Sequence, residues 1–436
     1  MKKIVWLYSL LAAALVLSIA EQGWAEVKPG DTITKDNLAE AEELLTPVTR
    51  WMVERGMPMA VIAPKKVEWP QAYKEATEKY AGQVKLSADG RNMYNYVAGS
   101  PFPTIDPNDP LVAFKLMWDH EQRPYIIDNI GTEWISELVN SKGELERTYA
   151  SSFWRRLMWS GRLYTDPKPV IPHNPPIRYT EQWGPMFLPN DLKGAGVLNF
   201  RYLSPEVPDD TYMYLPELRR VRRLSSANRS DAFWGSDVDV DSVGGFNAKV
   251  SYWTFRLLGE KTILAVVHSG KYGERSQWCA PRDGTQGFLA ALPCVPWEKR
   301  KVWIVEGLPT GYSQYAYSKR ILYLDQDFFG PIVTEMYDPG GELWKGGVGC
   351  VFYTKKPYAG YPARPVEGGK YHYEDEWPFT PNGLLMDLQQ THATTFDAPS
   401  SYAKPTEWVN EWYFNEAVPI NTEQAYSLSY LIESAR

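Results

Sequence analysis

The chain has 436 residues, of which 44% are hydrophobic and 23% are charged. This composition can supply a core, and it excludes an intrinsically disordered protein. The formal net charge of −7 at pH 7 argues against a general nucleic-acid binder. Aromatic residues make up 14% of the chain, which favours strands and apolar pockets.

The first 25 residues have the pattern of a secretory signal peptide. Lys2 and Lys3 give a positive start, residues 6–20 form an apolar stretch, and Gly23 to Ala25 offer small residues for cleavage. The alternative, a membrane-spanning segment, would require about 20 apolar residues. We expect cleavage near Ala25 and export of the mature protein to the periplasm.

Three helices are predicted near the amino terminus. Apolar residues between 38 and 52 recur every three or four positions, which predicts a helix that Pro47 kinks and Gly56 ends. A second helix is predicted over residues 70–81 and a third over residues 110 to about 120.

Most of the remaining chain is predicted to form strands joined by short turns. These strands comprise residues 84–86, 93–97, 134–139, 145–150, 197–203, 211–215, 250–258, 262–268, 302–306, 315–324, 332–337 and 343–345. Turns this short join antiparallel neighbours. We therefore predict an α+β, mainly β fold with one large curled antiparallel sheet and a few helices. The region from about residue 357, rich in Pro, Trp and Tyr, is expected to wrap the surface.

Cys279 and Cys294 are 15 positions apart and are predicted to form a disulfide, which an oxidising compartment permits. The bridge would stabilise the fold by about 3 kcal/mol in the chain-entropy model. The alternative is two buried thiols. Cys350 is left over and is expected to be buried and unreactive.

Motifs of the common enzyme classes are absent from the sequence. There is no Gly-x-Ser-x-Gly elbow, no His-Glu-x-x-His motif and no phosphate loop ending in Gly-Lys-Ser/Thr. The sequence therefore predicts no catalytic residue, no metal site and no cofactor. Because carboxylates are numerous, a pair of acidic residues acting on a sugar stays open as an alternative.

The densest run of charge extends from Arg219 to Arg223. On a strand, Arg220 and Arg222 would share one face, and at least two of the guanidinium groups in the run would point toward a covered side. A buried arginine needs an anionic partner. That partner is either a ligand, such as a lipid head group, or the acidic run at residues 237–241.

The acidic run contains Asp237, Asp239 and Asp241 and resembles the start of a calcium loop. Ser242 stands where an EF-hand requires Gly, and Ala248 stands where it requires Glu. An EF-hand is therefore excluded. Pairing with the arginines, or binding of a cation, would relieve the repulsion among the carboxylates.

Trp253 and Phe255 would share one face of a strand and present large aromatic rings to the interior. They indicate either an ordinary sheet core or the wall of a cavity for a long apolar ligand.

Several of these segments resemble a bacterial exported family named domain of unknown function 1329. The resemblance spans roughly residues 30–350 and rests chiefly on residues 76–87, 95–103, 214–225, 229–231, 235–242, 317–320 and 337–338. The family is similar to the periplasmic lipoprotein carriers LolA and LolB. This similarity implies an incomplete antiparallel β-barrel with helices covering its open side and an apolar cavity between them. It also implies no catalysis, and partners among inner-membrane exporters and outer-membrane proteins.

We therefore expect a signal peptide over residues 1–25, a helical lead-in over 26–82 and a carrier domain over 83–436. The predicted function is that of a periplasmic carrier or chaperone that binds a lipid, acyl chain or lipoprotein and helps its transfer toward the outer membrane. Trp253 and Phe255 are predicted to line the cavity, and Arg220 and Arg222 to contact a head group or latch a lid. The alternatives are an enzyme acting on envelope lipid or polysaccharide, and a non-catalytic adaptor between an inner-membrane exporter and the outer membrane.

Overall fold

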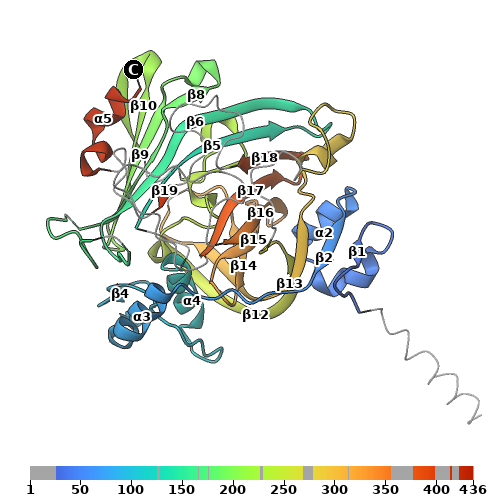
Figure 1. Ribbon diagram of the computed structural model, residues 1–436, viewed down its shortest axis with the longest axis horizontal. Helices are drawn as coiled ribbons and strands as arrows, with labels where there is room; N and C mark the ends of the chain where they lie inside the picture. The colour runs from blue at the N-terminus through green and yellow to red at the C-terminus, as the bar shows by residue number, and fades with distance from the viewer. Residues whose placement is uncertain are drawn as a thin grey trace, which may run out of the picture.

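The computed structural model describes residues 26–124, 128–164, 166–174, 176–225, 229–268, 278–312, 314–354, 377–397, 413–414 and 422–435. The predicted signal peptide lies outside these residues. Seventeen strands of the described chain form one sheet, and two more form a separate hairpin. The sheet curls without closing into a barrel (Figure 1). Within the described ranges, no helix combines the length and apolar character needed to cross a membrane.

The main ladder of the sheet is antiparallel throughout, as predicted. In order across the sheet its strands are β12 (Trp253–Ala265), β13 (Pro296–Pro309), β14 (Lys319–Asp325), β15 (Pro331–Tyr337), β16 (Leu343–Thr354), β17 (Trp377–Asp387), β18 (His392–Asp397), β5 (Asn129–Val139), β6 (Leu145–Met158), β7 (Ile177–Trp183), β9 (Gly196–Tyr202), β10 (Asp210–Leu215) and β11 (Arg220–Leu224). In the described chain, β12 and β11 are therefore its two free edges.

Short strands extend this ladder at three places. β2 (Met59–Ile62) pairs in parallel with β13 and antiparallel with β1 (Thr32–Ile33). β8 (Met186–Leu188) pairs with β6, and β19 (Tyr413–Phe414) pairs with β5. The separate hairpin consists of β3 (Lys85–Leu86) and β4 (Met93–Tyr94). The mainly β architecture is confirmed, with one parallel pairing added to it.

Three strands come from the region that was expected to wrap the surface. β17 pairs with β16 and β18 pairs with β5, so residues 377–397 join the two halves of the sheet, and the short β19 also pairs with β5. The expectation is corrected for these residues, because their backbone groups complete the ladder instead of lying over it. Residues 357–376, 398–412, 415–421 and 436 of the same region lie outside the described chain.

The turn predicted at residues 259–261 is also corrected. β12 passes through these positions as one strand of 13 residues paired with β13. A shift in register between Leu257 and Gly259 leaves Leu258 as the extra residue of a β-bulge. Exposed charged residues recur along this edge strand, so a solvated edge resembles a turn in sequence.

Five helical segments matter for the packing. They are η1 (Leu38–Leu44), α2 (Pro47–Glu54), α3 (Gln71–Tyr80), α4 (Val112–Glu121) and α5 (Leu428–Glu433). Pro47 does not kink one long helix but begins α2, where Thr46 caps the helix by accepting a hydrogen bond from the backbone N–H of Thr49. The remaining 3-10 turns are η2 (Ala81–Gln83), η3 (Asn190–Leu192), η4 (Pro216–Leu218), η6 (Phe233–Gly235), η7 (Val240–Ser242), η8 (Val250–Tyr252), η10 (Gly287–Ala291) and η11 (Glu423–Tyr426).

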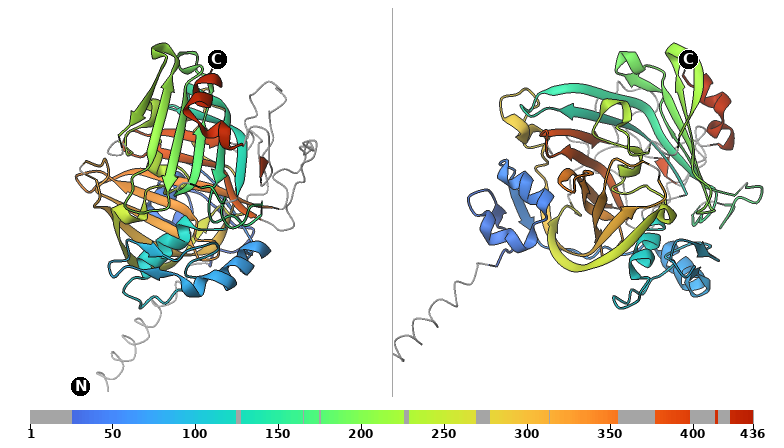
Figure 2. Two further views of the ribbon diagram at one scale, coloured as in Figure 1. Left: turned by 90° about the vertical axis from the view of Figure 1, so that its left-hand side faces the viewer. Right: turned by 180° about the vertical axis from the view of Figure 1, so that it is seen from behind.

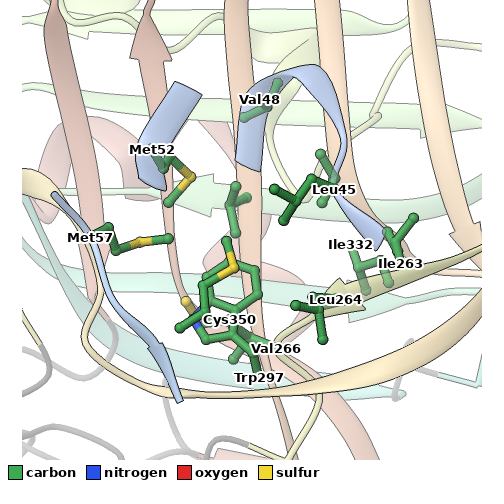
Figure 3. Packing of buried hydrophobic residues seen from close by; sticks show 14 of the residues in the cluster. Leu45, Val48, Met52, Met57, Ile263, Leu264, Val266, Trp297, Ile332 and Cys350 are labelled. Atoms are coloured by element: carbon green, nitrogen blue, oxygen red, sulfur yellow. The ribbon is translucent and has the colours of Figure 1, made fainter. Parts of the chain in front are cut away.

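The largest hydrophobic core lies between α2 and the sheet (Figure 3). Val48 and Met52 of α2 are fully buried against residues such as Ile263, Trp297 and Ile332. Burial of one such side chain contributes about 1.5–3 kcal/mol. This contact holds the amino-terminal residues to the sheet.

The three cysteines lie in different surroundings. The sulfur atoms of Cys279 and Cys294 are bonded at 2.02 Å, and this disulfide encloses the 3-10 turn η10. Cys350 of β16 is a buried cysteine in the core beneath α2.

Candidate functional site

A cavity of about 230 Å³ lies inside the curl of the sheet. Alternate residues of neighbouring strands line it: Trp154 and Arg156 on β6, and Val197, Asn199 and Arg201 on β9. Because alternate side chains of a strand share a face, one face of the sheet forms the wall. On β16, Gly347 lines the cavity, whereas its neighbour Gly346 faces α2. The cavity and α2 therefore occupy opposite faces.

Part of the cavity lining is a cluster of aromatic rings. The Trp183 ring packs against Trp134 and Trp154, with centroid distances of 5.4 and 5.5 Å. Phe396 of β18 stacks on Trp134 at 6.1 Å. Leu384 of β17 adds an aliphatic surface beside them. These side chains offer the apolar surface that a hydrocarbon needs.

A cationic, hydrogen-bonded part of the lining adjoins these rings, because the guanidinium carbon of Arg156 lies 5.7 Å from the centroid of the Trp154 ring. Arg156 donates from Nη2 to Glu181 Oε1 at 3.1 Å, and its guanidinium carbon lies 4.4 Å from the centroid of the Tyr179 ring. Arg178 of β7 is paired with Glu121 at the end of α4. Burial raises the pKa of Tyr179, so its hydroxyl stays protonated.

A third arginine, Arg201, completes this cationic part of the lining. Its Nη2 donates to Asp209 Oδ2 at 2.9 Å and to the carbonyl of Asn247 at 2.6 Å. Burial alone would lower the pKa of Arg201, but Asp209 and Glu121 outweigh it and raise the pKa well above its ordinary value. The guanidinium therefore keeps its charge although it is buried.

The wall opposite the sheet is the inner segment, which we define as residues 229–252. It supplies lining residues from Phe233 to Val250, and α4 adds His120 and Glu121. Its yellow-green chain runs within the curl of the sheet (Figure 2). The partners that hold it come from strands on both halves of the sheet, which places it across the concave face.

Asp237 fixes the inner segment to β18. Its Oδ2 accepts hydrogen bonds from Thr394 Oγ1 and from His392 Nδ1, each at 2.8 Å. His392 Nε2 lies 3.1 Å from Glu146 Oε2 on β6. The hydrogen bond to Asp237 is the main cause that raises the pKa of His392 to about 9, so the imidazole is protonated at neutral pH.

Asp239 fixes the inner segment to β14. Tyr317 donates its hydroxyl to Asp239 Oδ2 at 2.6 Å, and Arg320 donates from Nη2 to Asp239 Oδ1 at 3.3 Å. Arg320 also donates to the carbonyl of Asp241 at 2.9 Å. Asp239 and Arg320 are both fully buried. They form an ion pair shielded from water.

Asp241 has its own partners. Arg229 Nε donates to Asp241 Oδ1 at 2.6 Å, and the Tyr315 hydroxyl donates to Oδ2 at 2.8 Å. Burial would lower the pKa of Arg229, but Asp241 and Asp209 together raise it. The acidic run thus lies in a loop with a 3-10 turn, not on a strand. Arginines elsewhere in the chain neutralise it, and the run at 219–223 takes no part.

The residues predicted to form the site lie outside the cavity wall. Trp253 is fully buried behind Phe246, which does line the cavity, with ring centroids 5.2 Å apart. Phe255 packs edge-on against Phe114 of α4 at 5.5 Å. The two predicted residues share a face of β12, but α4 covers that face. They therefore belong to a core layer.

Arg220 and Arg222 are exposed on the edge strand β11. The prediction that guanidinium groups of this run point toward a covered side is corrected, because β11 is an edge strand on which the side chains of Arg220, Arg222 and Arg223 are all exposed. In the described chain nothing pairs with the outer side of β11. Neither arginine lines the cavity.

The sequence patterns did not identify the residues that line the cavity. The inward positions of β5, β6, β7 and β9 mix tryptophan with Ser, Arg, Glu and Asn. The signal in the sequence is a repeat at every second residue, as in Trp154 and Arg156, or Glu181 and Trp183. A test for alternating apolar residues overlooks such strands, because their buried face is amphipathic.

Fold and site together define a protein with one large curled, unclosed sheet and a small cavity inside it that is lined by aromatic and cationic side chains. The chain belongs to the family described as protein of unknown function (DUF1329), whose model matches residues 32–418.

Individual relatives are distant. An uncharacterised Pseudomonas aeruginosa protein, PA3922, is 22% identical over 333 residues, which cover 74% of this chain and 69% of the relative. Among crystal structures, a putative outer membrane lipoprotein-sorting protein domain from Vibrio parahaemolyticus is 16% identical with a TM-score of 0.47, covering 73% of this chain and 98% of that one. A DUF1329 family protein from Desulfovibrio piger is 14% identical with a TM-score of 0.43, covering 70% and 92%. The LolA superfamily protein NE2245 from Nitrosomonas europaea is 11% identical with a TM-score of 0.38, covering 72% and 98%.

Proposed function

We propose that this protein is a carrier for a hydrophobic, amphipathic ligand such as a lipid or another acylated molecule. The observation that supports this most is the cavity within the curled sheet, whose lining combines aromatic rings with cationic side chains. An acyl chain would lie against Trp134, Trp154 and Trp183, and an anionic or carbonyl-bearing head would lie toward Arg156 and Arg178. Each buried methylene contributes about 0.8 kcal/mol.

The carboxylates of the cavity support a carrier over an enzyme. Those that line it in the described chain are engaged by arginines: Glu181 by Arg156, Glu121 by Arg178 and Asp239 by Arg320. A general acid or base needs a carboxyl group that can exchange a proton with a substrate. We therefore assign a binding role to the cavity and no chemical step.

We propose that the carrier acts in the periplasm and that it helps to transfer its ligand toward the outer membrane. The amino-terminal sequence with the features of a signal peptide supports this location. The Cys279–Cys294 disulfide also suits an oxidising compartment.

Quenching of tryptophan fluorescence by dibrominated stearate tests the proposal. Four tryptophans line the cavity, namely Trp134, Trp154, Trp183 and Trp234, so a bromine-labelled chain inside it lies close to each. Ser136 is a buried cavity residue of β5, and Ser136→Trp would fill the space that the chain needs. We expect saturable quenching that this variant weakens at least about tenfold, equivalent to about 1.4 kcal/mol.

Ser141→Trp provides a matched control because it adds the same ring at an exposed turn residue. It should bind stearate like the unmodified protein. Circular dichroism should show that both variants fold. Equal affinity of the two variants would contradict binding in this cavity.

A further inference from the structure

The hairpin of β10 and β11 carries a dense positive charge at a free edge of the sheet, beside α5 (Figure 1). Four arginines occupy five consecutive positions, and Glu217 is the only carboxylate between residues 216 and 224. All four side chains are exposed: Arg219, Arg220, Arg222 and Arg223. We define these arginines together with Leu218 as the basic rim.

Most of this charge lacks a counter-ion among the residues that the structure describes. Arg223 is paired with Asp210. In the described ranges, no ion pair involves Arg219, Arg220 or Arg222. A solvated guanidinium with no internal partner is available to phosphate groups, which it can bind through two parallel hydrogen bonds.

The basic rim continues the face of the sheet that lines the cavity. Arg222 lies opposite Met213 on β10, and Met213 lies opposite Val197 on β9. Residues directly opposite each other in a sheet share a face. Val197 is a cavity residue, so Arg222 lies on the same face two strands farther toward the edge. A group that binds Arg222 therefore meets the concave side of the sheet.

An apolar side chain accompanies the arginines. Leu218 lies at the turn of the hairpin and is 45% exposed. Arg219 follows it in the left-handed conformation with φ of 47°, so the turn is tight and the hairpin ends in a narrow ridge. A ridge with arginines on both faces and a leucine at its tip fits the head-group layer of a bilayer better than the flat surface of an acidic protein.

We propose that the basic rim docks this protein onto an anionic lipid surface, with the arginines on lipid phosphates and Leu218 in the head-group layer. The chain as a whole has a net charge of −7, so the remainder of the molecule is repelled by the same surface. Docking is thus oriented, with the free edge of the sheet toward the lipid. This inference goes beyond the proposed carrier function and does not depend on which ligand occupies the cavity.

Co-sedimentation with phosphatidylcholine vesicles that contain or lack phosphatidylglycerol tests the docking. The protein should bind the anionic vesicles, bind less as salt is added, and bind neutral vesicles weakly. The double variant Arg220→Ala and Arg222→Ala should bind about 30-fold more weakly, since each basic residue near such a surface contributes a factor of about five. Leu218→Ser should weaken binding and leave the salt dependence unchanged.

The matched control is Arg50→Ala with Arg256→Ala, which removes the same charge from exposed sites elsewhere. It should bind like the unmodified protein, and all variants should keep their circular dichroism. Equal losses in both double variants would overturn the proposal, as would equal binding to neutral vesicles. Binding of polyglutamate through Arg220 and Arg222 with no vesicle binding would indicate an acidic protein partner and would also overturn it.

Discussion

Replacement of Arg320 by methionine tests how the inner segment is held against the sheet. Methionine keeps most of the side-chain volume but removes the guanidinium that pairs with Asp239 and donates to the carbonyl of Asp241. Tyr317 still donates to Asp239, but the carboxylate is fully buried and loses its charged partner. Leaving such a charge unpaired costs about 3–5 kcal/mol.

The free energy of unfolding measured by urea titration should therefore fall by about 3–5 kcal/mol in Arg320→Met. Adding Asp239→Asn removes the orphaned charge and should restore about 2 kcal/mol of this loss. Arg256→Met is the control: its partner is Glu306, its side chain is 70% exposed, and its removal should leave stability almost unchanged.

Two results would show that Arg320 does not hold the inner segment through Asp239. One is a loss in Arg320→Met no larger than that in Arg256→Met, which would mean that the pair does not hold the inner segment. The other is a double variant that loses at least the sum of the two single losses, which would mean that Asp239 and Arg320 do not interact.

Two further predictions concern His392 and Gly346. The pKa of His392 is about 9 in the folded protein against an ordinary 6.5, so its contribution is complete below pH 6.5 and is lost as pH rises through 9. The free energy of unfolding of the unmodified protein should therefore exceed that of His392→Gln by about 1–2 kcal/mol near pH 6 and by almost nothing near pH 10. A difference that grows with pH would contradict the pairing of a protonated His392 with Asp237. A Cβ at Gly346 would lie 2.7 Å from Val48 Cγ1, so Gly346→Ala should lower the free energy of unfolding in urea titrations by about 1–3 kcal/mol. Gly82→Ala is the control, because a Cβ at Gly82 would meet no atom within 4 Å, and it should leave stability unchanged. Equal effects of the two substitutions would show that α2 can shift freely.

The sequence predicts those parts of the fold that local chemistry determines. The turn at residues 140–143 joins β5 to β6 as expected, and Pro70 begins α3 as expected. The curled antiparallel sheet follows from such short connections. In contrast, β7, with the sequence Ile-Arg-Tyr-Thr-Glu-Gln-Trp, was not predicted, because its buried face carries Glu181 beside Trp183.

The cavity could not be predicted because its walls meet only after long-range pairing. Trp134 and Phe396 stack across the contact between β5 and β18, which are more than 250 positions apart. The runs of charged residues indicated that ion pairs would form, but they did not indicate which residues would pair. Asp239 and Arg320 are 81 positions apart, and nothing in either local sequence selects the other.

Native mass spectrometry of the protein purified from its producing cells tests whether the cavity holds an acylated amphiphile. We expect a bound species that denaturation releases, that fragments as an acyl-chain compound, and that is absent from Ser136→Trp. Identical spectra for the unmodified protein and Ser136→Trp, with no species released from either, would contradict the claim.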